Sequence, residues 1–309
     1  MNLKNTIFIV VIILFLLQLI LMKDDAKVHE QNKKPNVALS TFALYDAAHA
    51  ILEDTANTFM IMPAGVDAHS YEPTPKQVIK LYKSDLVFYS GAGLEPWIDS
   101  FEFKNKAIDM SKKVTLRELN SHEHHNHHTN SHEQSVDPHY WLDLSNMVKI
   151  ANFMTQEFIK LAPNNEKKYL KNRDLYVQRL KNLDKHYKES LSSCKLDTIV
   201  VNHNAFSYLS KKYDFNVEAL SGLSPDAQPS AKSMAELIEH VREHKLKTIF
   251  FESFVSDKAI KSIANEAKVG VDILEPLGNI TADEWSEKLS YEDIMLSNLE
   301  KISKALECR

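Results

Sequence analysis

Glycine is scarce in this chain, with six residues among 309. Neither of the two common glycine-rich phosphate-binding patterns, GxxxxGK followed by Ser or Thr and GxGxxG, occurs in it. The sequence also lacks an excess of basic residues, because the formal net charge is −5 and no basic stripe offsets it. Nucleotide-binding loops of these types are therefore excluded, and the charge argues against a nucleic-acid-binding protein.

Cysteine is nearly absent, and the two that occur are Cys194 and Cys308. In an oxidising compartment an even pair is compatible with a disulfide. Two unrelated thiols are equally compatible, because a sequence does not give the Cα separation that a disulfide requires. The sequence leaves both states open.

The N-terminus carries a long apolar run. Lys4 precedes the run from Ile7 to Met22, which only Gln18 interrupts, and Lys23 follows it. A positive start before an apolar block is typical of an export signal or a signal anchor. The run has about 16 residues, at or slightly below the length that spans ~30 Å of hydrocarbon as a helix. Cleavage and retention both stay open, and either predicts a periplasmic or otherwise extracytoplasmic protein, tethered if the segment is retained.

Beyond a polar linker that ends at residue 34, short apolar runs alternate with amphipathic stretches. This alternation predicts βαβ units and a parallel sheet. We expect a signal or anchor with its linker over residues 1–34 and an N-terminal α/β domain over residues 35–162. The predicted strands are 36–40, 59–63 and 85–90, and the predicted helices are 42–55, 75–83 and 145–161.

A long polar stretch follows this first α/β pattern. From Asn164 through Ser192 the chain has neither proline nor glycine, and apolar residues recur at roughly helical spacing. About 29 residues at 1.5 Å each make a helix of roughly 40 Å. This stretch predicts a stiff connecting helix within residues 163–193.

After Cys194 the alternation of strands and helices restarts. It predicts a C-terminal α/β domain over residues 194–309. The predicted fold class is therefore α/β, with two similar domains that have parallel sheets and are joined by one long helix. The predicted strands are 198–202, 216–220, 248–252 and 271–275, and the predicted helices lie at about 205–213, 230–244, 257–268 and 288–306.

Three histidines and one glutamate share a position relative to the predicted strands. His69 and His139 lie in turns, His203 directly follows a strand, and Glu275 stands at a strand end. In open α/β sheets, ligands bind outside the carboxyl ends of the strands. Three imidazoles and one carboxylate satisfy the tetrahedral preference of Zn²⁺, so we predict a zinc site formed by these four residues. Hydrogen-bonded structural histidines and a turn-capping glutamate are the alternative.

Five segments, taken in order, resemble the zinc- and manganese-specific substrate-binding proteins of bacterial ABC importers. The resemblance covers about residues 36–306. It implies two α/β domains joined by one long helix, a metal site in the cleft between them, and a partner permease in the inner membrane. The segments are GVDAHSYEPTP (65–75), GAGLEPWI (91–98), DPHYWLD (137–143), HNAFSYL (203–209) and LEPLG (274–278).

The resemblance also implies the ligand set. His69, His139 and His203 match metal-ligand positions of that family, and Glu275 falls where relatives have an aspartate, a glutamate or no ligand. A histidine at the third position is the zinc-type choice, whereas manganese-type members usually have a carboxylate there, because the harder ion prefers oxygen. The chain therefore resembles a receptor that captures Zn²⁺ and passes it to the permease. Separately, we expect it to be a monomer.

Residues 121–133 (SHEHHNHHTNSHE) hold six of the fourteen histidines. Zinc-type members of the family often carry such an insertion just before the DPH motif. Ordering a flexible segment around a metal costs roughly 1–2 kcal/mol per residue fixed. We therefore expect this His-rich loop to be a tether that binds zinc more weakly than the cleft; a solvated tract without a task is the alternative. His49, His186, His240 and His244 are expected to be surface residues on helices.

Other functions compete with zinc capture. An exported zinc hydrolase would need an open water position and a general base, for which Glu72 and Glu252 are candidates. A Mn²⁺-binding receptor or a metal-buffering adhesin of the same fold also fits the anchor and the His-rich loop. Full coordination by the four predicted ligands would leave no position for a substrate, so we expect a binding protein and no enzyme. Three histidine ligands further predict zinc affinity that falls steeply below about pH 6, because free histidine titrates near ~6.5.

Overall fold

The computed structural model describes residue 18 and residues 34–103, 107–118, 136–221, 231–253 and 258–309. The chain divides into two units, Met1–Pro35 and Asn36–Arg309, and the second contains every sheet described below. Apart from residue 18, the predicted signal or anchor lies outside the described residues. Within the described part of the chain, no helix combines the length and the apolar character needed to cross a membrane.

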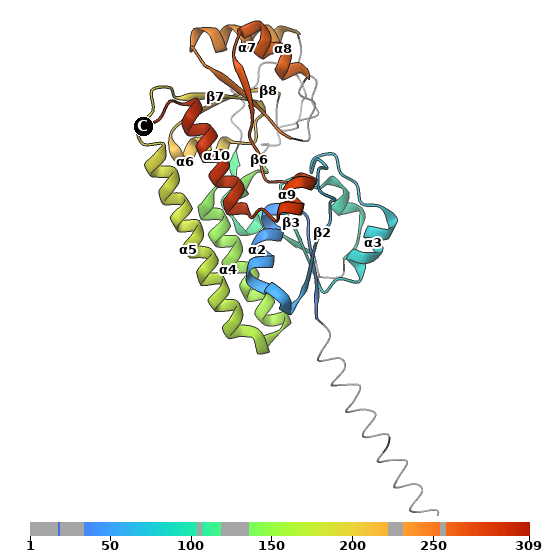
Figure 1. Cartoon of the computed structure of the whole chain (residues 1–309). Helices are drawn as coiled ribbons and strands as arrows, with labels where there is room; N and C mark the ends of the chain where they lie inside the picture. The colour runs from blue at the N-terminus through green and yellow to red at the C-terminus, as the bar shows by residue number, and fades with distance from the viewer. Residues whose placement is uncertain (1–17, 19–33, 104–106, 119–135, 222–230, 254–257) are drawn as a thin grey trace, which may run out of the picture. The chain divides into compact units, whose positions relative to one another are not determined.

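The first sheet has four parallel strands in the order β2-β1-β3-β4. Figure 1 labels two of them, β2 and β3. Its central strand β1 (Asn36–Leu39) is largely buried, as expected for a parallel strand that is covered on both faces. The strand predicted at 59–63 begins and ends earlier along the chain, and the sequence pattern does not predict β4. The other bounds are β2 Asn57–Met60, β3 Leu86–Tyr89 and β4 Ala107–Asp109.

The second sheet repeats this topology with the order β10-β9-β7-β8, again all parallel. In both sheets the first strand pairs with the second on one side and with the third on the other. The strand order therefore reverses next to β1 in the first sheet and next to β7 in the second, the crevices where open α/β sheets bind ligands. The bounds are β7 Thr198–His203, β8 Asn216–Ser221, β9 Thr248–Phe251 and β10 Gly270–Ile273.

Helix α2 (Phe42–Leu52) covers the first sheet with an alanine-rich face, and small side chains let it approach the strands closely. A capping box between Thr74 and Gln77 starts α3 (Pro75–Tyr82). In the second half, helices follow the strands in the order that the sequence predicts. Their bounds are α6 Ser207–Tyr213, α7 Ala231–Glu243 and α8 Lys258–Ala267.

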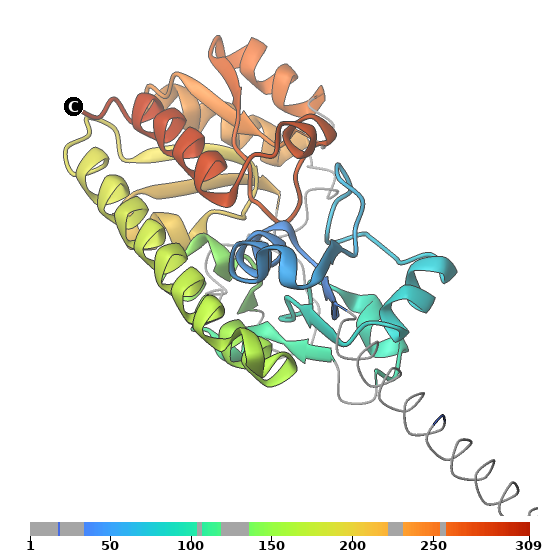
Figure 2. The same cartoon turned by 60° about the horizontal axis from the view of Figure 1, so that its bottom comes forward.

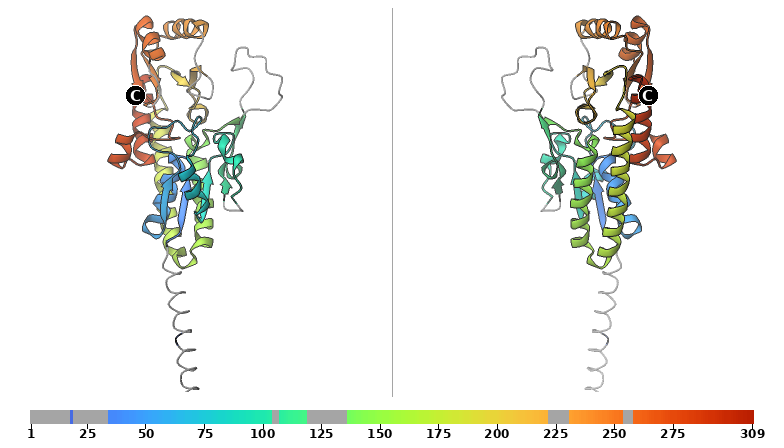
Figure 3. Two further views of the ribbon diagram at one scale, coloured as in Figure 1. Left: turned by 90° about the vertical axis from the view of Figure 1, so that its right-hand side faces the viewer. Right: turned by 90° about the vertical axis from the view of Figure 1, so that its left-hand side faces the viewer.

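Helix α5 (Glu166–Ser190) is the predicted long helix. It has 25 residues, which is about 38 Å at 1.5 Å per residue. Its buried side chains, from Tyr169 to Tyr187, recur every three or four residues and form one stripe. Helix α4 (Leu144–Leu161) lies beside α5 (Figure 3), and Figure 2 shows α5 along its whole length. The predicted α/β fold with two parallel sheets and one long helix is confirmed.

The helix predicted at 288–306 is confirmed as α10 (Tyr291–Ala305), and the sequence pattern does not predict the short helix α9 (Ala282–Glu287) before it. Lys288 ends α9 with a left-handed backbone, at a φ of 58°. The hydroxyl of Ser290 then caps α10 by accepting a hydrogen bond from a backbone N–H of its first turn. The left-handed Lys288 and the capping Ser290 thus separate α9 from α10.

Helix α10 packs against α5 and α2. Its side chains Tyr291 and Met295 are fully buried and belong to the same hydrophobic cluster as Val37 of β1. A smaller cluster around Ile249 lies between the second sheet and helices α7 and α8. The large core therefore includes both ends of the folded unit, and the domain boundaries at 162 and 193 stay a prediction.

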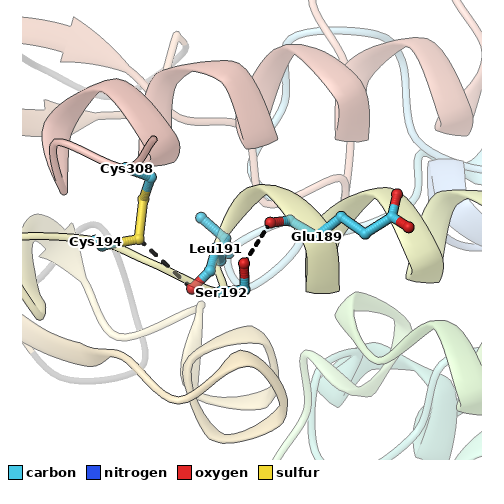
Figure 4. Close-up of a disulfide and its surroundings, with 5 residues drawn as sticks. All are labelled: Glu189, Leu191, Ser192, Cys194 and Cys308. Carbon is cyan, nitrogen blue, oxygen red and sulfur yellow. Dashed lines mark hydrogen bonds between the residues drawn. A yellow bond between two sulfur atoms is a disulfide. The ribbon is translucent and has the colours of Figure 1, made fainter.

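Cys194 and Cys308 form a disulfide (Figure 4), which decides between the two states that the sequence leaves open. Cys194 follows α5, and its Sγ lies 3.5 Å from the carbonyl oxygen of Leu191. The two cysteines are 114 residues apart, so the bond closes a loop that contains the whole second sheet. It ties the segment after α10 to the end of α5.

Strands β5 (Arg117–Glu118) and β6 (Val136–Asp137) form a short antiparallel pair that the sequence pattern does not predict. Glu118 pairs with Val136, so the residues on either side of segment 119–135 lie next to each other. The His-rich loop, 121–133, lies outside the described residues.

Candidate metal centre

Three histidines from three separate segments converge. His69 lies in the loop after β2, His139 follows β6, and His203 is the last residue of β7. Nε2 of His139 lies 3.2 Å from Nε2 of His69 and 3.5 Å from Nε2 of His203. One ring nitrogen of each histidine lies within 4.8 Å of the other two, and no other such group of His, Cys, Asp or Glu is found among the described residues.

His69 and His139 are positioned by the same local device, an aspartate two residues earlier. The carboxylate of Asp67 accepts a hydrogen bond from the backbone N–H of His69 at 3.1 Å, and that of Asp137 accepts from the backbone N–H of His139 at 2.9 Å. Such turns satisfy backbone donors outside regular structure. The D-x-H spacing thus fixes the backbone on which each imidazole stands.

Asp137 also holds the imidazole of His139. Its Oδ1 accepts from Nδ1 of His139 at 2.8 Å, and the hydroxyl of Ser207 donates to its Oδ2. Burial by itself raises the pKa of Asp137, but the charge interaction with His139 and these hydrogen bonds lower that pKa below its usual value. The ionised carboxylate therefore keeps the proton on Nδ1 and leaves Nε2 free to bind a metal.

Glu252 lies next to His203. It follows β9, the neighbour of β7, and its Oε1 lies against Nδ1 of His203. Both side chains are buried. Burial raises the pKa of Glu252 to about 8, although the charge of His139 and a hydrogen bond from Asn202 act in the opposite direction. This contact also directs Nε2 of His203 toward the other two histidines.

The imidazoles of His69 and His203 resist protonation. Burial lowers the pKa of His69 to about 2 and the pKa of His203 to about 3, and the charge of the neighbouring His139 lowers both further. Neutral imidazole is the form that binds metal ions. The centre is therefore ready to bind a divalent cation without first losing protons from His69 or His203.

Glu275 is not a member of the three-histidine group in this structure. The hydroxyl of Ser253 donates to its Oε1, and its backbone N–H and C=O both pair with the side chain of Asn298, at 3.1 and 2.7 Å. Its Oε2 is buried without a hydrogen-bond partner. Burial raises the pKa of Glu275 to about 7. The carboxylate is thus buried and only half satisfied.

The space between the histidines is small. It is about the size of a single water molecule or ion, and Leu94 and Trp141 contribute apolar walls. Trp141 is fixed by a hydrogen bond of 2.7 Å from its Nε1 to the carbonyl oxygen of Pro276. Glu252 lines this cavity together with the histidines. A cavity of this size fits a single ion.

The remaining candidates lie elsewhere. Glu72 is exposed, so it is poorly placed as a general base for a hydrolase. His49, His186 and His244 are exposed, as predicted, whereas His240 is half-buried and stacks on His244 with ring centroids 4.1 Å apart.

Sequence reasoning overlooks the roles of Asp137 and Glu252. From the sequence, Asp137 is predicted to be only a turn residue before a proline. The pattern that could have identified its role is its spacing to His139, which is the same as the spacing of Asp67 to His69. Glu252 reads as a candidate general base, and the structure instead sets it against His203. Its signal is its position at a strand end, equivalent to that of Glu275.

Residues 37–305 match the family described as zinc-uptake complex component A, periplasmic (ZnuA). The chain is 32% identical over 278 residues to the zinc-binding lipoprotein AdcA of Streptococcus pneumoniae, covering 88% of this chain and 56% of that protein. It is 30% identical over 280 residues to the high-affinity zinc uptake system protein ZnuA of Bacillus subtilis, covering 88% of both chains. This chain therefore spans about half the length of the streptococcal relative.

The structure is similar to a crystal structure of the Zn(II)-bound ZnuA-like domain of Streptococcus pneumoniae AdcA. The TM-score is 0.74 at 30% identity, and the match covers 89% of this chain and 100% of that domain. The matched part of the longer relative is thus a complete domain of the same fold.

Proposed function

We propose that this chain, which belongs to the zinc-uptake complex component A family, captures Zn²⁺ outside the cytoplasmic membrane and delivers it to an ABC-type import permease. The observation that carries the proposal is the convergence of Nε2 of His69, His139 and His203 on one ion-sized space. Nitrogen donors suit a borderline-soft cation, and three of them favour zinc over manganese.

The proposed ligands are His69, His139, His203 and Glu275. Three imidazoles leave one corner of a tetrahedron for the carboxylate. The unpartnered, buried Oε2 of Glu275 supports this role, because a buried carboxylate oxygen without a donor is costly unless a cation satisfies it. As the fourth ligand, Glu275 would give up its contact with Ser253.

The proposal also covers the cellular location of the protein and its partners. The apolar N-terminal run favours export, with or without retention as an anchor, and so supports a periplasmic or otherwise extracytoplasmic receptor. The chain would act as a monomer of two α/β domains around the connecting helix, and an ABC permease in the membrane would take the ion from it. The His-rich loop would gather zinc beside the centre.

A binding role fits the cavity better than hydrolysis does. A catalytic zinc needs an open position for water and space for a substrate. The cavity holds about one ion, and Glu252 is engaged with His203. We therefore expect no turnover of ester, peptide or β-lactam substrates by the zinc-loaded protein.

Single replacements of the histidines test the proposal. His69→Ala, His139→Ala and His203→Ala should each raise the zinc dissociation constant at least about tenfold, because each removes one of four ligands. Zinc competition with a chelator of known affinity measures the change, and circular dichroism checks folding. His186→Ala, an exposed histidine of α5, is the matched control. Wild-type affinity in all three variants at a one-to-one site would refute the proposed ligand set.

A further inference from the structure

Asp137 contacts residues from both α/β parts of the chain. It ends β6, and its side chain is fully buried. Its two carboxylate oxygens have different partners: His139, two residues further on, and Ser207, at the start of α6. A buried charge persists only where such partners replace the lost hydration. Both partners are buried as well.

One oxygen determines the chemistry of His139. Oδ1 of Asp137 accepts from the backbone N–H of His139 at 2.9 Å and from its Nδ1 at 2.8 Å. A proton held on Nδ1 leaves the lone pair on Nε2. Nε2 is the nitrogen that faces Nε2 of His69 at 3.2 Å. Rotation of the ring, or the other tautomer, would break the bond to Asp137.

The other oxygen reaches the segment that carries His203. The hydroxyl of Ser207 donates to Oδ2 of Asp137, and the hydroxyl of Tyr208 donates to the backbone carbonyl of Asp137 at 2.9 Å. The turn between His203 and α6 is short and closed by a bond of 2.9 Å from the N–H of Ala205 to the carbonyl of His203. The start of α6 is thus bonded to the carboxylate that holds His139.

We infer that Asp137 is a positioning residue that sets both the tautomer of His139 and the separation of His139 from His203. The inference rests on the proposed function and adds to it a residue that does not touch the ion. Both effects act on zinc affinity, the first through the donor atom and the second through the distance between two ligands.

Three variants separate the two effects. Asp137→Ala removes both contacts and should raise the zinc dissociation constant about 10–100-fold, as loss of a partner behind a metal-bound histidine typically does. Asp137→Asn keeps the shape but gives up the charge that selects the Nδ1–H tautomer. Ser207→Ala loosens the link to α6 and should raise the dissociation constant several-fold with the tautomer of His139 unchanged.

Asp143 provides the matched control. Its carboxylate caps α4 through the N–H of Ser145 at 2.8 Å and also bonds to Lys212 of α6. Asp143→Asn therefore weakens a link between the same two parts of the chain without touching a histidine. It should change the stability of the fold but leave zinc affinity within about twofold of wild type.

The measurements are zinc competition titrations and ¹⁵N spectra of histidine-labelled, metal-free protein, with the His139 signals identified by their loss in His139→Ala. We expect an Nδ1–H tautomer in the wild type and a mixture of tautomers in Asp137→Asn. If Asp137→Ala fails to fold, Asp137→Asn and Ser207→Ala carry the test.

Two results would overturn the inference: Asp137 variants with the zinc affinity of Asp143→Asn, or an unchanged His139 tautomer in Asp137→Asn. Failure of the wild-type protein to bind zinc tightly would instead refute the proposed function. The tautomer spectra of the metal-free protein would still report on Asp137 in that case.

Discussion

Glu95 is a buried carboxylate at the carboxyl end of β3. Its two oxygens accept from the backbone N–H groups of Ser90 and Gly91 at 2.7 and 2.9 Å, and burial raises its pKa above the usual value. A raised pKa in the folded state means that its contribution to stability is present at low pH and is lost as the pH rises through that pKa. Glu95 therefore makes the free energy of unfolding depend on pH.

Glu95→Gln removes this titration. The variant should gain stability relative to the wild type as the pH rises above about 4.5, by at most about 1.4 kcal/mol per pH unit. Urea unfolding of the metal-free protein at pH 5 and pH 8 measures the difference. The exposed Glu266→Gln serves as the control. A difference between Glu95→Gln and wild type that is the same at both pH values would contradict the assignment.

The pH dependence of zinc binding also follows from single residues. Free histidines would lead to a steep loss of affinity below about pH 6, but burial holds the pKa values of His69 and His203 near 2 and 3. Glu275, with its pKa raised to about 7, is the proposed ligand that must give up a proton. Between pH 7 and 5 we expect Glu275 to contribute about one proton per zinc to the slope of affinity against pH, and Glu275→Gln to remove that contribution. Calorimetric titrations at several pH values check it, and a slope near three would restore the free-histidine expectation.

At the scale of residues, the sequence predicts which histidines come together but not how they are held. The grouping of His69, His139 and His203 can be predicted because these histidines follow strands or lie in turns. The contacts around them join Asp137 to Ser207 and Glu252 to His203, across wide separations in the chain. Such pairs depend on the packing of the two sheets, which no local pattern encodes.

Among the elements, the hairpin of β5 and β6 allows a clean test of the His-rich loop. Because Glu118 and Val136 pair directly, a two-residue Asn-Gly turn can replace residues 119–135 and close the hairpin. The variant should bind fewer zinc ions and keep the tightest site, since Asp137 and His139 retain their contacts. Mass spectrometry under native conditions gives the stoichiometry, and competition titration gives the affinity. Loss of the tight site would make the loop part of the centre.

The segment between β10 and α9 is a second element with a testable role. Asn279 is buried, and its Nδ2 donates to the carbonyl oxygens of Pro63 and Val66, each at 2.7 Å. It thereby holds the loop that carries His69. Asn279→Ala removes the donor of these two partly buried hydrogen bonds and should cost at most about 1–3 kcal/mol for each. Chemical unfolding measures the loss, with the exposed Asn182→Ala as control; equal stabilities would show that water takes over both bonds.

Elements with a strong repeating pattern agree with the sequence, and short ones do not. Helix α5 can be predicted from the regular spacing of its apolar residues, and strand β7 can be predicted from its continuous apolar run. β4, β5 and β6 have two or three residues each, so no periodicity can be seen in them. The stop at Lys288 is invisible for another reason: lysine gives no signal for a left-handed backbone.

For the molecule as a whole, the disulfide between Cys194 and Cys308 is a covalent constraint across 114 residues. Closing a loop of this length in the unfolded chain is worth about 4–5 kcal/mol in the chain-entropy model. The double variant Cys194→Ser and Cys308→Ser should therefore unfold at lower denaturant concentration than the oxidised protein. Its zinc site should persist, because neither cysteine contacts the histidines. Wild-type protein treated with a reductant should match the variant; an unchanged midpoint in both would show that the native fold gains nothing from the bond.

The return of α10 to the first half of the chain has a consequence for biosynthesis. Tyr291 and Met295 belong to the same hydrophobic core as Val37. Nearly the whole length of the polypeptide therefore lies, in sequence, between residues that share this core. A ribosome releases the N-terminal strands long before the helix that covers them, and contacts this distant in sequence form slowly. The N-terminal part of the chain therefore stays incompletely folded and exposed until the C-terminal residues have left the ribosome. A nascent chain halted before Tyr291 should remain sensitive to proteases and dependent on chaperones, even though both sheets have been synthesised.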